Sequence, residues 1–543
     1  MKKRNIYMLI FLQVALLMIS CTESFLDRGP LDTMPAGLYY QTEEGIRYAA
    51  NAMYAPLGEE GFNGKTFWMI GDGAADDAQA NGEDPDYIPI DKFSLASDNP
   101  RNADLWQIIY KMIALTNIVL ENSDPEVNDS DQELLDRVTG EALALRAFGY
   151  FVLVRLYSDV PLILDGMHPD SLKTPERKSA FKVYQQIIGD LEEAIPLLPT
   201  KTRYAEMNEL PGRLNKHGAM ATLAMVYMTI AGDLSMYNTE SNPNNETNIR
   251  SIASPAACYQ TALDLCEEII ISGEYSLLPD FAVLWTREGD NCAESVWQLQ
   301  FIGNKTRHGS GNMRQAFWAP WQSEITGAGD GWGTHSPHSD LARCFYDNPD
   351  DLIVDGNIVD STVVPPTDLR FRETIMFPGV EYPELPVLST GEPYALPYAY
   401  GASGFACKKY VIGAGDDVGS MKAPNNVYLV RYAEIFIMKA ECLVELNGSM
   451  AEAAAALDDL RIRAGKAVID GGLGQEEMRE IIRLERRREL ALEQKRWFDI
   501  LRWNIAYEVL AAQDIVLDPE RRLFPIPSTE IALNPALVQN TGY

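Results

Sequence analysis

The chain has 543 residues, of which 46% are hydrophobic and 10% aromatic, and its formal net charge is −32. The apolar content is ample for a large packed core. A strongly acidic protein repels the phosphates of nucleic acids and the headgroups of anionic lipids, so both are excluded as partners.

The first 20 residues have the pattern of a signal peptide. Three basic residues at positions 2–4 precede an apolar stretch at 6–19. At about 14 residues, this stretch is too short to span a bilayer and has the length of the hydrophobic region of a secretory signal. Cys21 follows directly after the small residue Ser20, as at the cleavage site of bacterial lipoproteins. The prediction is a lipoprotein signal peptide at 1–20, and an ordinary secretory leader with an incidental cysteine is the alternative.

Cleavage before Cys21 would make this residue the acylated start of the mature protein. It would also remove three positive charges and no negative one, which brings the net charge to −35. Several acyl chains hold a protein firmly at a membrane, since each buried CH₂ contributes about 0.8 kcal/mol. No other segment has the uninterrupted apolar composition of a span, so we expect the rest to be a tethered soluble body.

Pairs of helices recur along the chain. Two predicted helices share the apolar spacing i, i+4, i+7, i+11, which is one face of a helix. The positions are Tyr184, Ile188, Leu191 and Ile195 in the first helix and Tyr259, Leu263, Cys266 and Ile270 in the second. Alanine-rich helices precede them at 141–157 and 218–232, and a third pair follows at 427–446 and 449–465. The repeat resembles the tetratricopeptide class and predicts a mainly α-helical scaffold.

The six cysteines beyond Cys21 show no C-x-x-C pair and no zinc spacing. Cys258 and Cys266 lie eight residues apart on one predicted helix. That spacing is a rise of about 12 Å, beyond the roughly 7 Å limit on Cα separation for a disulfide. We expect most of the six to be buried as small hydrophobic side chains.

The composition changes to Gly, Pro, Trp and Tyr between the second and third helix pairs, roughly at 281–423. Within this insert, alternating residues at 294–303 predict a short strand. Long irregular segments carried on a helical scaffold usually hold the functional residues. We therefore expect the insert to bind the ligand.

Five segments taken together resemble a known family. They are CTESFLDRGPLD at 21–32, LWQIIYKMIALTNIVLEN at 105–122, GEALALRAFGYFVLVRLYSDVPLIL at 140–164, IIRLERRRELALEQKRWFDILRW at 481–503 and LFPIPSTEIALNPALVQNTGY at 523–543. In this order they resemble the SusD/RagB family of cell-surface nutrient-binding lipoproteins of Bacteroidetes. One departure is Gln494, where the family often has glycine before the arginine.

The resemblance implies one SusD-like domain over residues 21–543, with a helical, tetratricopeptide-like fold. Such a protein would sit on a SusC-like TonB-dependent transporter at the outer face of the outer membrane and capture a nutrient, most often an oligosaccharide. Most of the matching residues are expected to be structural. Those expected to form charge pairs are Glu485, Arg488, Glu489, Glu493 and Arg496, and those expected to pack in the core are Trp106, Tyr150, Trp497 and Trp503.

Three tryptophans in a Gly-rich loop, Trp318, Trp321 and Trp332, are the best candidates for a sugar platform. Flat aromatic rings stack on the apolar face of a pyranose, and amides, carboxylates and arginines bond its hydroxyls. Polar residues among them are Arg314, Gln315, Gln322, Glu324 and Asp330. Trp318 and Trp321 would share one face of a helical turn, so a core position stays open as an alternative.

A second cluster lies in the polar stretch before the helix that contains Trp106. Its members are Phe67, Trp68, Asp76, Asp77, Tyr87, Asp98, Asn99 and Arg101. Members of the family often build the ligand face from this early loop together with the segment after the central strand. On that resemblance we add Trp68, Tyr87 and Asn99 to the predicted ligand-binding residues, beside Arg314 and the tryptophans.

Enzyme and cofactor signatures fail on spacing. Residues 401–404 lack the G-x-S-x-G pattern, and the third glycine of 411–419 comes one residue late beside two aspartates. His335 and His338 are separated by a proline and lack helical metal-ligand spacing. Acidic pairs such as Asp84 and Asp86 are compatible with calcium, but the EF-hand pattern is missing. We predict no catalytic residue, metal or cofactor.

The sequence therefore predicts a non-catalytic glycan-binding lipoprotein that serves a SusC-like transporter. The same architecture could instead bind a peptide or another nutrient, since an aromatic face suits either ligand. A surface glycoside hydrolase is a third hypothesis, because such an enzyme also needs sugar platforms and two acids at a defined separation.

Overall fold

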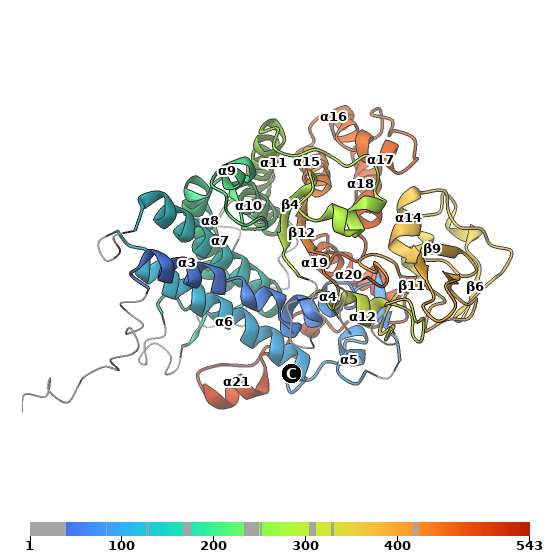
Figure 1. Cartoon of the computed structure of the whole chain (residues 1–543), viewed down its shortest axis with the longest axis horizontal. Coiled ribbons are helices and arrows are strands. Elements are labelled where there is room, and N and C mark those ends of the chain that lie inside the picture. The colour runs from blue at the N-terminus through green and yellow to red at the C-terminus, as the bar shows by residue number, and fades with distance from the viewer. Residues whose placement is uncertain are drawn as a thin grey trace, which may run out of the picture.

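The computed structural model describes residues 40–543 except 83, 126–127, 129, 167–174, 233–248, 250–251, 303–310, 327–330 and 416–421. Cys21, the predicted signal peptide and Asp330 lie outside the described residues. Helices dominate the described part, and its strands are short and paired two by two (Figure 1). The prediction of a mainly α fold is confirmed.

The N-terminal half is a layer of long helices, drawn in blue to green on the left of Figure 1. It contains α3 (Glu43–Ala52), α6 (Pro100–Asn122), α7 (Gln132–Tyr157) and α8 (Ala180–Leu197). The central helix α7 packs against both α6 and α8. Gly149 permits this approach, because a Cβ there would lie 2.9 Å from Met112 of α6. Helix α6 has the length and hydropathy of a membrane span, and half of that window is buried in the fold.

The predicted helix pairs are present, with one correction in the third. Helix α7 packs on α8, and α10 (Lys216–Ala231) packs on α11 (Pro255–Ile271). In the third pair, residues 427–431 are strand, and α15 (Tyr432–Glu445) begins only after them. The predicted helix at 427–446 was therefore wrong in its first five residues. Its partner at 449–465 is divided into α16 (Met450–Ala455) and α17 (Asp458–Arg463).

Tertiary pairing explains why that segment is a strand. The strand predicted around residues 294–303 is present as β4 (Ser295–Leu299), and it pairs antiparallel with β12 (Val427–Arg431). All residues of both strands are buried. This central ribbon lies between the helical layer and the irregular insert (Figure 1).

The insert between α11 and α15 is built from short elements. Its helices are α12 (Arg314–Trp318), α13 (Ser339–Arg343) and α14 (Leu369–Thr374). Its other strands are β5 (His335–Pro337), β6 (Val354–Asp355), β7 (Ile358–Val359), β8 (Ile375–Met376), β9 (Glu381–Pro386), β10 (Pro393–Ala395) and β11 (Ala406–Cys407). Pairing joins β6 to β7, β8 to β11 and β9 to β10, while β5 leaves the insert to pair with a strand of the early loop.

The remaining elements connect and close the scaffold. The short helices are α4 (Thr66–Gly71), α5 (Ile88–Asp91), α9 (Lys201–Glu206), α19 (Arg496–Arg502), α20 (Ala506–Ala511) and α21 (Ser528–Leu533), and the long one is α18 (Gln475–Leu490). The strands are β1 (Ala78–Ala80), β2 (Val160–Pro161) and β3 (Arg177–Lys178), and a π-helical turn spans Glu60–Gly64. Single 3₁₀ turns lie at Ala55–Gly58, Ala282–Trp285, Arg287–Gly289, Pro349–Asp351 and Pro519–Arg521.

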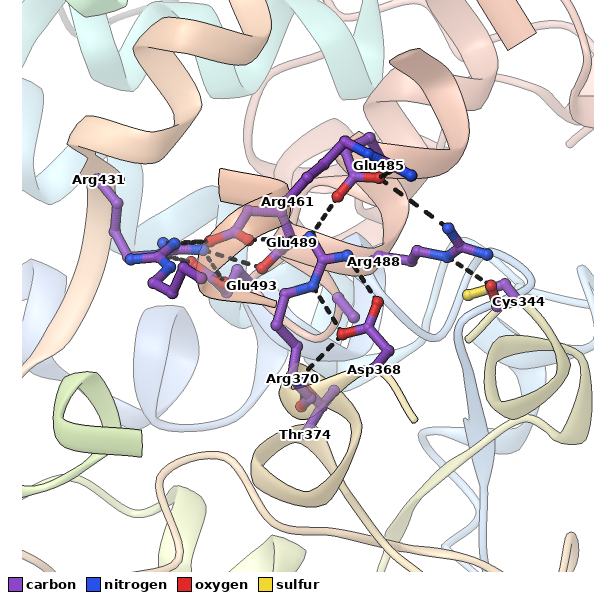
Figure 2. Close-up of polar contacts among 12 residues, drawn as sticks. Cys344, Asp368, Arg370, Thr374, Arg431, Arg461, Glu485, Arg488, Glu489 and Glu493 are labelled. Atoms are coloured by element: carbon purple, nitrogen blue, oxygen red, sulfur yellow. Dashed lines mark hydrogen bonds and ion pairs between the residues drawn. The ribbon is translucent and has the colours of Figure 1, made fainter. Parts of the chain in front are cut away.

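A network of buried charges surrounds the end of α18 (Figure 2). Arg370 contacts Asp368 at 2.7 Å, Glu485 at 2.6 Å and Glu489 at 3.1 Å, and none of these side chains is exposed. Arg431 reaches Glu489 at 3.0 Å and Glu493 at 2.8 Å. Each of these buried charges has a partner, as burial of a charge requires. Since the partners lie on different elements, the network joins α14, α18 and β12.

The same region of the chain holds the early loop in place. Arg496 of α19 contacts Asp76 at 2.6 Å, and Arg487 of α18 contacts Asp77 at 2.8 Å. The predicted charge pairs of Glu485, Arg488, Glu489, Glu493 and Arg496 are therefore confirmed, mostly between elements rather than along one helix. Trp106, Tyr150 and Trp497 are buried as predicted, and Trp503 is half-buried.

Gln494 adopts a backbone conformation that suits glycine. Its φ is +67°, in the left-handed region that disfavours residues with a Cβ. The backbone of Gly71 is so close that a Cβ on it would lie 2.6 Å from the Cα of Gln494. The glycine that the family often has at this position therefore has a physical reason.

The six cysteines beyond Cys21 are all free thiols in the structure. Four of them, Cys258, Cys266, Cys407 and Cys442, are buried, and the other two are half-buried. The prediction that most serve as small buried side chains is confirmed.

Candidate ligand-binding face

The early loop and the segment after β4 meet in an antiparallel pair of strands. β1 pairs with β5, with Ala80 opposite His335. The pairing continues at Asn81, whose backbone N–H donates to the carbonyl of Thr334 at 2.9 Å and whose side-chain amide donates to the carbonyl of Gly333 at 2.7 Å. The two regions that the resemblance implied as a ligand face are thus in contact.

Two of the candidate tryptophans lie in the core beneath this junction. Trp68 and Trp318 are fully buried, with their rings edge to face at a centroid distance of 5.7 Å. His335 stacks on Trp318 at 5.1 Å and contacts Trp68 at 4.6 Å. A sugar platform needs an exposed ring face, so the predictions for Trp68 and Trp318 are corrected. The core position left open for Trp318 is the one observed.

Tyr87, Arg314 and Asn99 are also held inside the fold. The hydroxyl of Tyr87 lies 2.7 Å from Nδ1 of His335, and burial raises the pKa of this tyrosine well above its ordinary value. Arg314 is fully buried beside Asn63, and burial lowers its pKa to about 10. Asn99 caps α6 by accepting hydrogen bonds from the first backbone amides of the helix. These three predicted binding residues therefore have structural roles.

Trp321 and Trp332 remain exposed, by 57% and 39% respectively. Their backbone segments are joined by a bridge between Trp321 and Gly331. The indole of Trp332 packs edge to face on Phe317 at 4.8 Å, and the backbone N–H of Trp332 donates to the carbonyl of Ala316 at 2.7 Å. Both rings are thus accessible to solvent on a backbone that is held in place.

The loop that carries Trp321 is tightly constrained. The backbone N–H of Trp321 donates to the hydroxyl of Tyr400 at 2.9 Å. The same hydroxyl would lie 2.4 Å from a Cβ at Gly333, whose φ is +55°, so only glycine fits there. Gln322 and Glu324 both have positive φ, a strained conformation for residues with a side chain. Such strain concentrates at ligand-binding and catalytic sites, where the surrounding structure maintains it.

Polar groups surround the exposed indoles. Gln322 and Glu324 are exposed in the same loop. Next to Phe317, on which Trp332 packs, the ammonium of Lys65 lies 5.3 Å from the centroid of the phenyl ring and 3.1 Å from Asp84. Burial opposes ionisation of Asp84, but the hydrogen bond and charge of Lys65, together with two backbone N–H groups, outweigh burial and lower the pKa of Asp84. The arrangement offers ring faces for stacking and amide and carboxylate groups for hydroxyls.

Asn81 and Tyr400 belong to this region and were missed from the sequence. Tyr398 is 43% exposed two residues before Tyr400, which is largely buried. The density of tyrosines at 394–400 was a signal in the sequence. Asn81 carried no such signal, because its position depends on the pairing of β1 with β5.

A hollow lies on another part of the insert. It has a volume of about 710 Å³ and separates residues 279–282 from 365–382. Phe281, Phe371 and Tyr382 line it but are buried, whereas Leu369 is exposed. It therefore lacks the exposed aromatic faces found at Trp321 and Trp332.

Comparison with known protein families agrees with the fold. The family described as the SusD family matches residues 293–543. A second family, described as starch-binding and associating with outer membrane, matches residues 41–228. The chain belongs to the SusD/RagB family.

Individual relatives cover nearly the whole chain. SusD-like protein P2 of Formosa agariphila is 27% identical over 99% of both chains, and a SusD-like protein of Bacteroides ovatus is 24% identical over 91% of this chain and 82% of its own. Among solved structures, a SusD homolog from Bacteroides thetaiotaomicron matches with a TM-score of 0.76 at 20% identity, covering 95% of this chain and 99% of its own. A laminarin binding SusD-like protein matches with a TM-score of 0.70 at 23% identity, covering 92% and 100%.

Proposed function

We propose that this protein is a glycan-binding lipoprotein of the bacterial cell surface that captures an oligosaccharide and delivers it to a SusC-like TonB-dependent transporter in the outer membrane. The observation that carries this proposal is the pair of exposed indoles, Trp321 and Trp332, at the junction of the early loop and the insert. The fold shared with a laminarin binding protein and with a surface glycan-binding protein of Bacteroides uniformis supports the proposal.

Binding would combine stacking with hydrogen bonds. A sugar ring on Trp321 or Trp332 would bury its apolar face, while its hydroxyls bond Gln322 and Glu324 in the same loop. Replacement of either tryptophan by alanine should weaken binding by about 1–2 kcal/mol, which is roughly tenfold in affinity. The melting temperature of Trp321→Ala should stay unchanged, because its ring is exposed, whereas that of Trp332→Ala should fall slightly, because its ring also packs on Phe317.

The test is calorimetry or affinity electrophoresis against a polysaccharide panel, with Tyr48→Ala as the matched control. Tyr48 is an equally exposed aromatic residue, but it lies on α3, outside the junction. Reduced affinity in Trp321→Ala and Trp332→Ala, but not in Tyr48→Ala, is expected. Normal binding by both tryptophan variants would place the site elsewhere.

We propose binding without turnover. The neighbouring aspartates Asp76 and Asp77 are buried and held by Arg487 and Arg496, so they are committed to ion pairs. Long incubation of the protein with a bound glycan should release no new reducing ends. Release in proportion to protein concentration would favour the glycoside hydrolase hypothesis.

We propose that Cys21 carries the lipid anchor after removal of residues 1–20. The Cys21→Ala variant should fold normally but leave the membrane fraction, because its acyl chains would be the attachment. Detergent partitioning and metabolic labelling with fatty acid test this. Incorporation of label by Cys21→Ala would disprove the assignment.

Delivery to a transporter is testable by co-purification. We expect the lipidated protein, solubilised in mild detergent, to retain a large TonB-dependent transporter of the same bacterium.

A peptide panel beside the polysaccharides tests the alternative ligand, since the exposed aromatic rings would also stack on peptide side chains. Binding of peptides alone would replace the glycan assignment.

A further inference from the structure

We infer that the ligand of Trp321 and Trp332 is an uncharged glycan rather than one bearing uronic acid or sulfate groups. This inference rests on the proposed function and adds a class of ligand to it. It derives from the charged groups that the structure places around the two indoles.

Among the described residues, two cations near the early loop, Lys65 and Arg101, are already engaged by carboxylates. Lys65, which lies against Phe317 below Trp332, contacts Asp84 at 3.1 Å, and both side chains are largely buried. The second cation, Arg101, contacts Asp86 at 3.3 Å and Asp104 at 3.1 Å. An anionic sugar would have to compete with these carboxylates for the cations, and it would leave a carboxylate without its partner.

The exposed charge nearest to Trp321 in the sequence is a carboxylate. Glu324 is exposed three residues after Trp321 and thus within about 11 Å of it along the backbone. Charges at this separation interact strongly at low salt, because the Debye length is about 30 Å at about 0.01 M against about 8 Å at physiological salt. Glu324 would therefore repel a sulfate or uronate bound at the indole, and the net charge of −32 acts in the same direction.

The same groups suit a neutral sugar. An ionised carboxylate is a strong acceptor for a hydroxyl donor, so Glu324 would bond a neutral sugar and repel an anionic one. Gln322, exposed two residues before it, supplies both donors and an acceptor without charge. Specificity of this kind arises from repulsion of the wrong ligand as much as from contacts to the right one.

The experiment compares neutral with anionic polysaccharides on affinity gels at low salt. The neutral set is laminarin, starch and arabinoxylan, and the anionic set is alginate, polygalacturonate and carrageenan. We expect retardation by at least one neutral glycan and by none of the anionic set. Retardation by an anionic glycan, with or without a neutral one, overturns this inference alone. Retardation by none of the six glycans counts against the proposed function, and the inference falls with it.

A pair of charge variants tests the role of Glu324. Glu324→Lys should acquire measurable binding of an anionic glycan at low salt, at least tenfold above the wild type. Glu193→Lys is the matched control, because it makes the same charge change at an exposed position of α8, outside the junction. Gain in Glu324→Lys alone supports the inference. Equal gain in both variants, or gain in neither, overturns it.

Discussion

The buried network around α18 and the exposed face at Trp321 and Trp332 use the same kinds of side chain in opposite ways. In the network, Arg370, Glu485 and Glu489 have no exposed surface, and Arg370 contacts both glutamates. At the face, Glu324 and the two indoles are exposed to solvent. Paired buried charges join elements of the fold, whereas accessible groups can contact a ligand.

Trp318 and Trp321, three residues apart, show the same contrast between a buried and an exposed side chain. Helix α12 ends at Trp318, whose ring is buried among Trp68, His335 and Tyr410. After Ala319 the chain leaves the helix, and Trp321 is exposed. Burial, rather than residue type, separates the structural aromatic from the candidate binding residue.

Acidification should have the largest effect on the network, because it removes many ion pairs together. Burial opposes ionisation of Glu489, but Arg463, Arg431 and Arg370 outweigh it and lower its pKa well below the ordinary value. The arginines at Glu493 and Asp499 also lower their pKa despite burial. Groups with a lowered pKa stabilise the fold above their unfolded pKa of about 4, and this contribution is lost as the pH falls through the folded pKa.

The melting temperature should therefore fall steeply below about pH 4. Asp290 acts in the opposite direction, because burial raises its pKa to about 6. Its contribution is present at low pH and is lost as the pH rises through about 6. Calorimetric scans between about pH 3 and pH 8 check both effects, and an unchanged melting temperature at about pH 3 would show that the network contributes little.

Removal of one member of the network should also destabilise the protein strongly. Glu489→Ala leaves Arg370, Arg431 and Arg463 without a shared partner, which should cost about 3–5 kcal/mol in free energy of unfolding. Glu480→Ala is the control on the same helix, since Glu480 forms an exposed pair with Arg483. It should cost less than about 1 kcal/mol. Denaturant unfolding of both variants measures the difference, and equal losses would contradict it.

The two tryptophans should respond differently to truncation. Trp318→Ala should lower the free energy of unfolding by about 3–5 kcal/mol, because it opens a cavity in the core. Trp321→Ala should leave stability within about 0.5 kcal/mol of the wild type, since its ring is exposed. Thermal melts of the two variants side by side test this. Early melting of Trp321→Ala would show that its ring supports the fold.

Gln494→Gly should produce the smallest change, and in the stabilising direction. Glycine adopts a φ of +67° without strain, and the substitution removes two buried polar atoms that lack a hydrogen-bond partner among the described residues. We expect a gain of about 0.5–1 kcal/mol. Gln494→Ala is the control, because it removes the same polar atoms but keeps the Cβ. Equal stability of the Gly and Ala variants would show that the backbone conformation is not the cause.

Local patterns in the sequence predicted the helices well. Alanine-rich segments and one-faced apolar spacing identify α7, α8, α10 and α11, because helix formation depends on neighbours three and four residues apart. Where the secondary structure of a segment depends on pairing with a distant segment, the prediction was wrong. Residues 427–431 are strand because β4, more than 120 residues earlier, pairs with them.

The family also followed from the sequence, and so did the two regions that form the candidate face. Which tryptophans in those regions are accessible did not follow, since Trp68, Trp318, Trp321 and Trp332 all lie in stretches of similar composition. Exposure depends on how β1, β5 and α12 pack together, and that packing joins segments more than 230 residues apart. The sequence alone determined the fold class and the region of the candidate face, while tertiary packing decided which side chains of that region are accessible to a ligand.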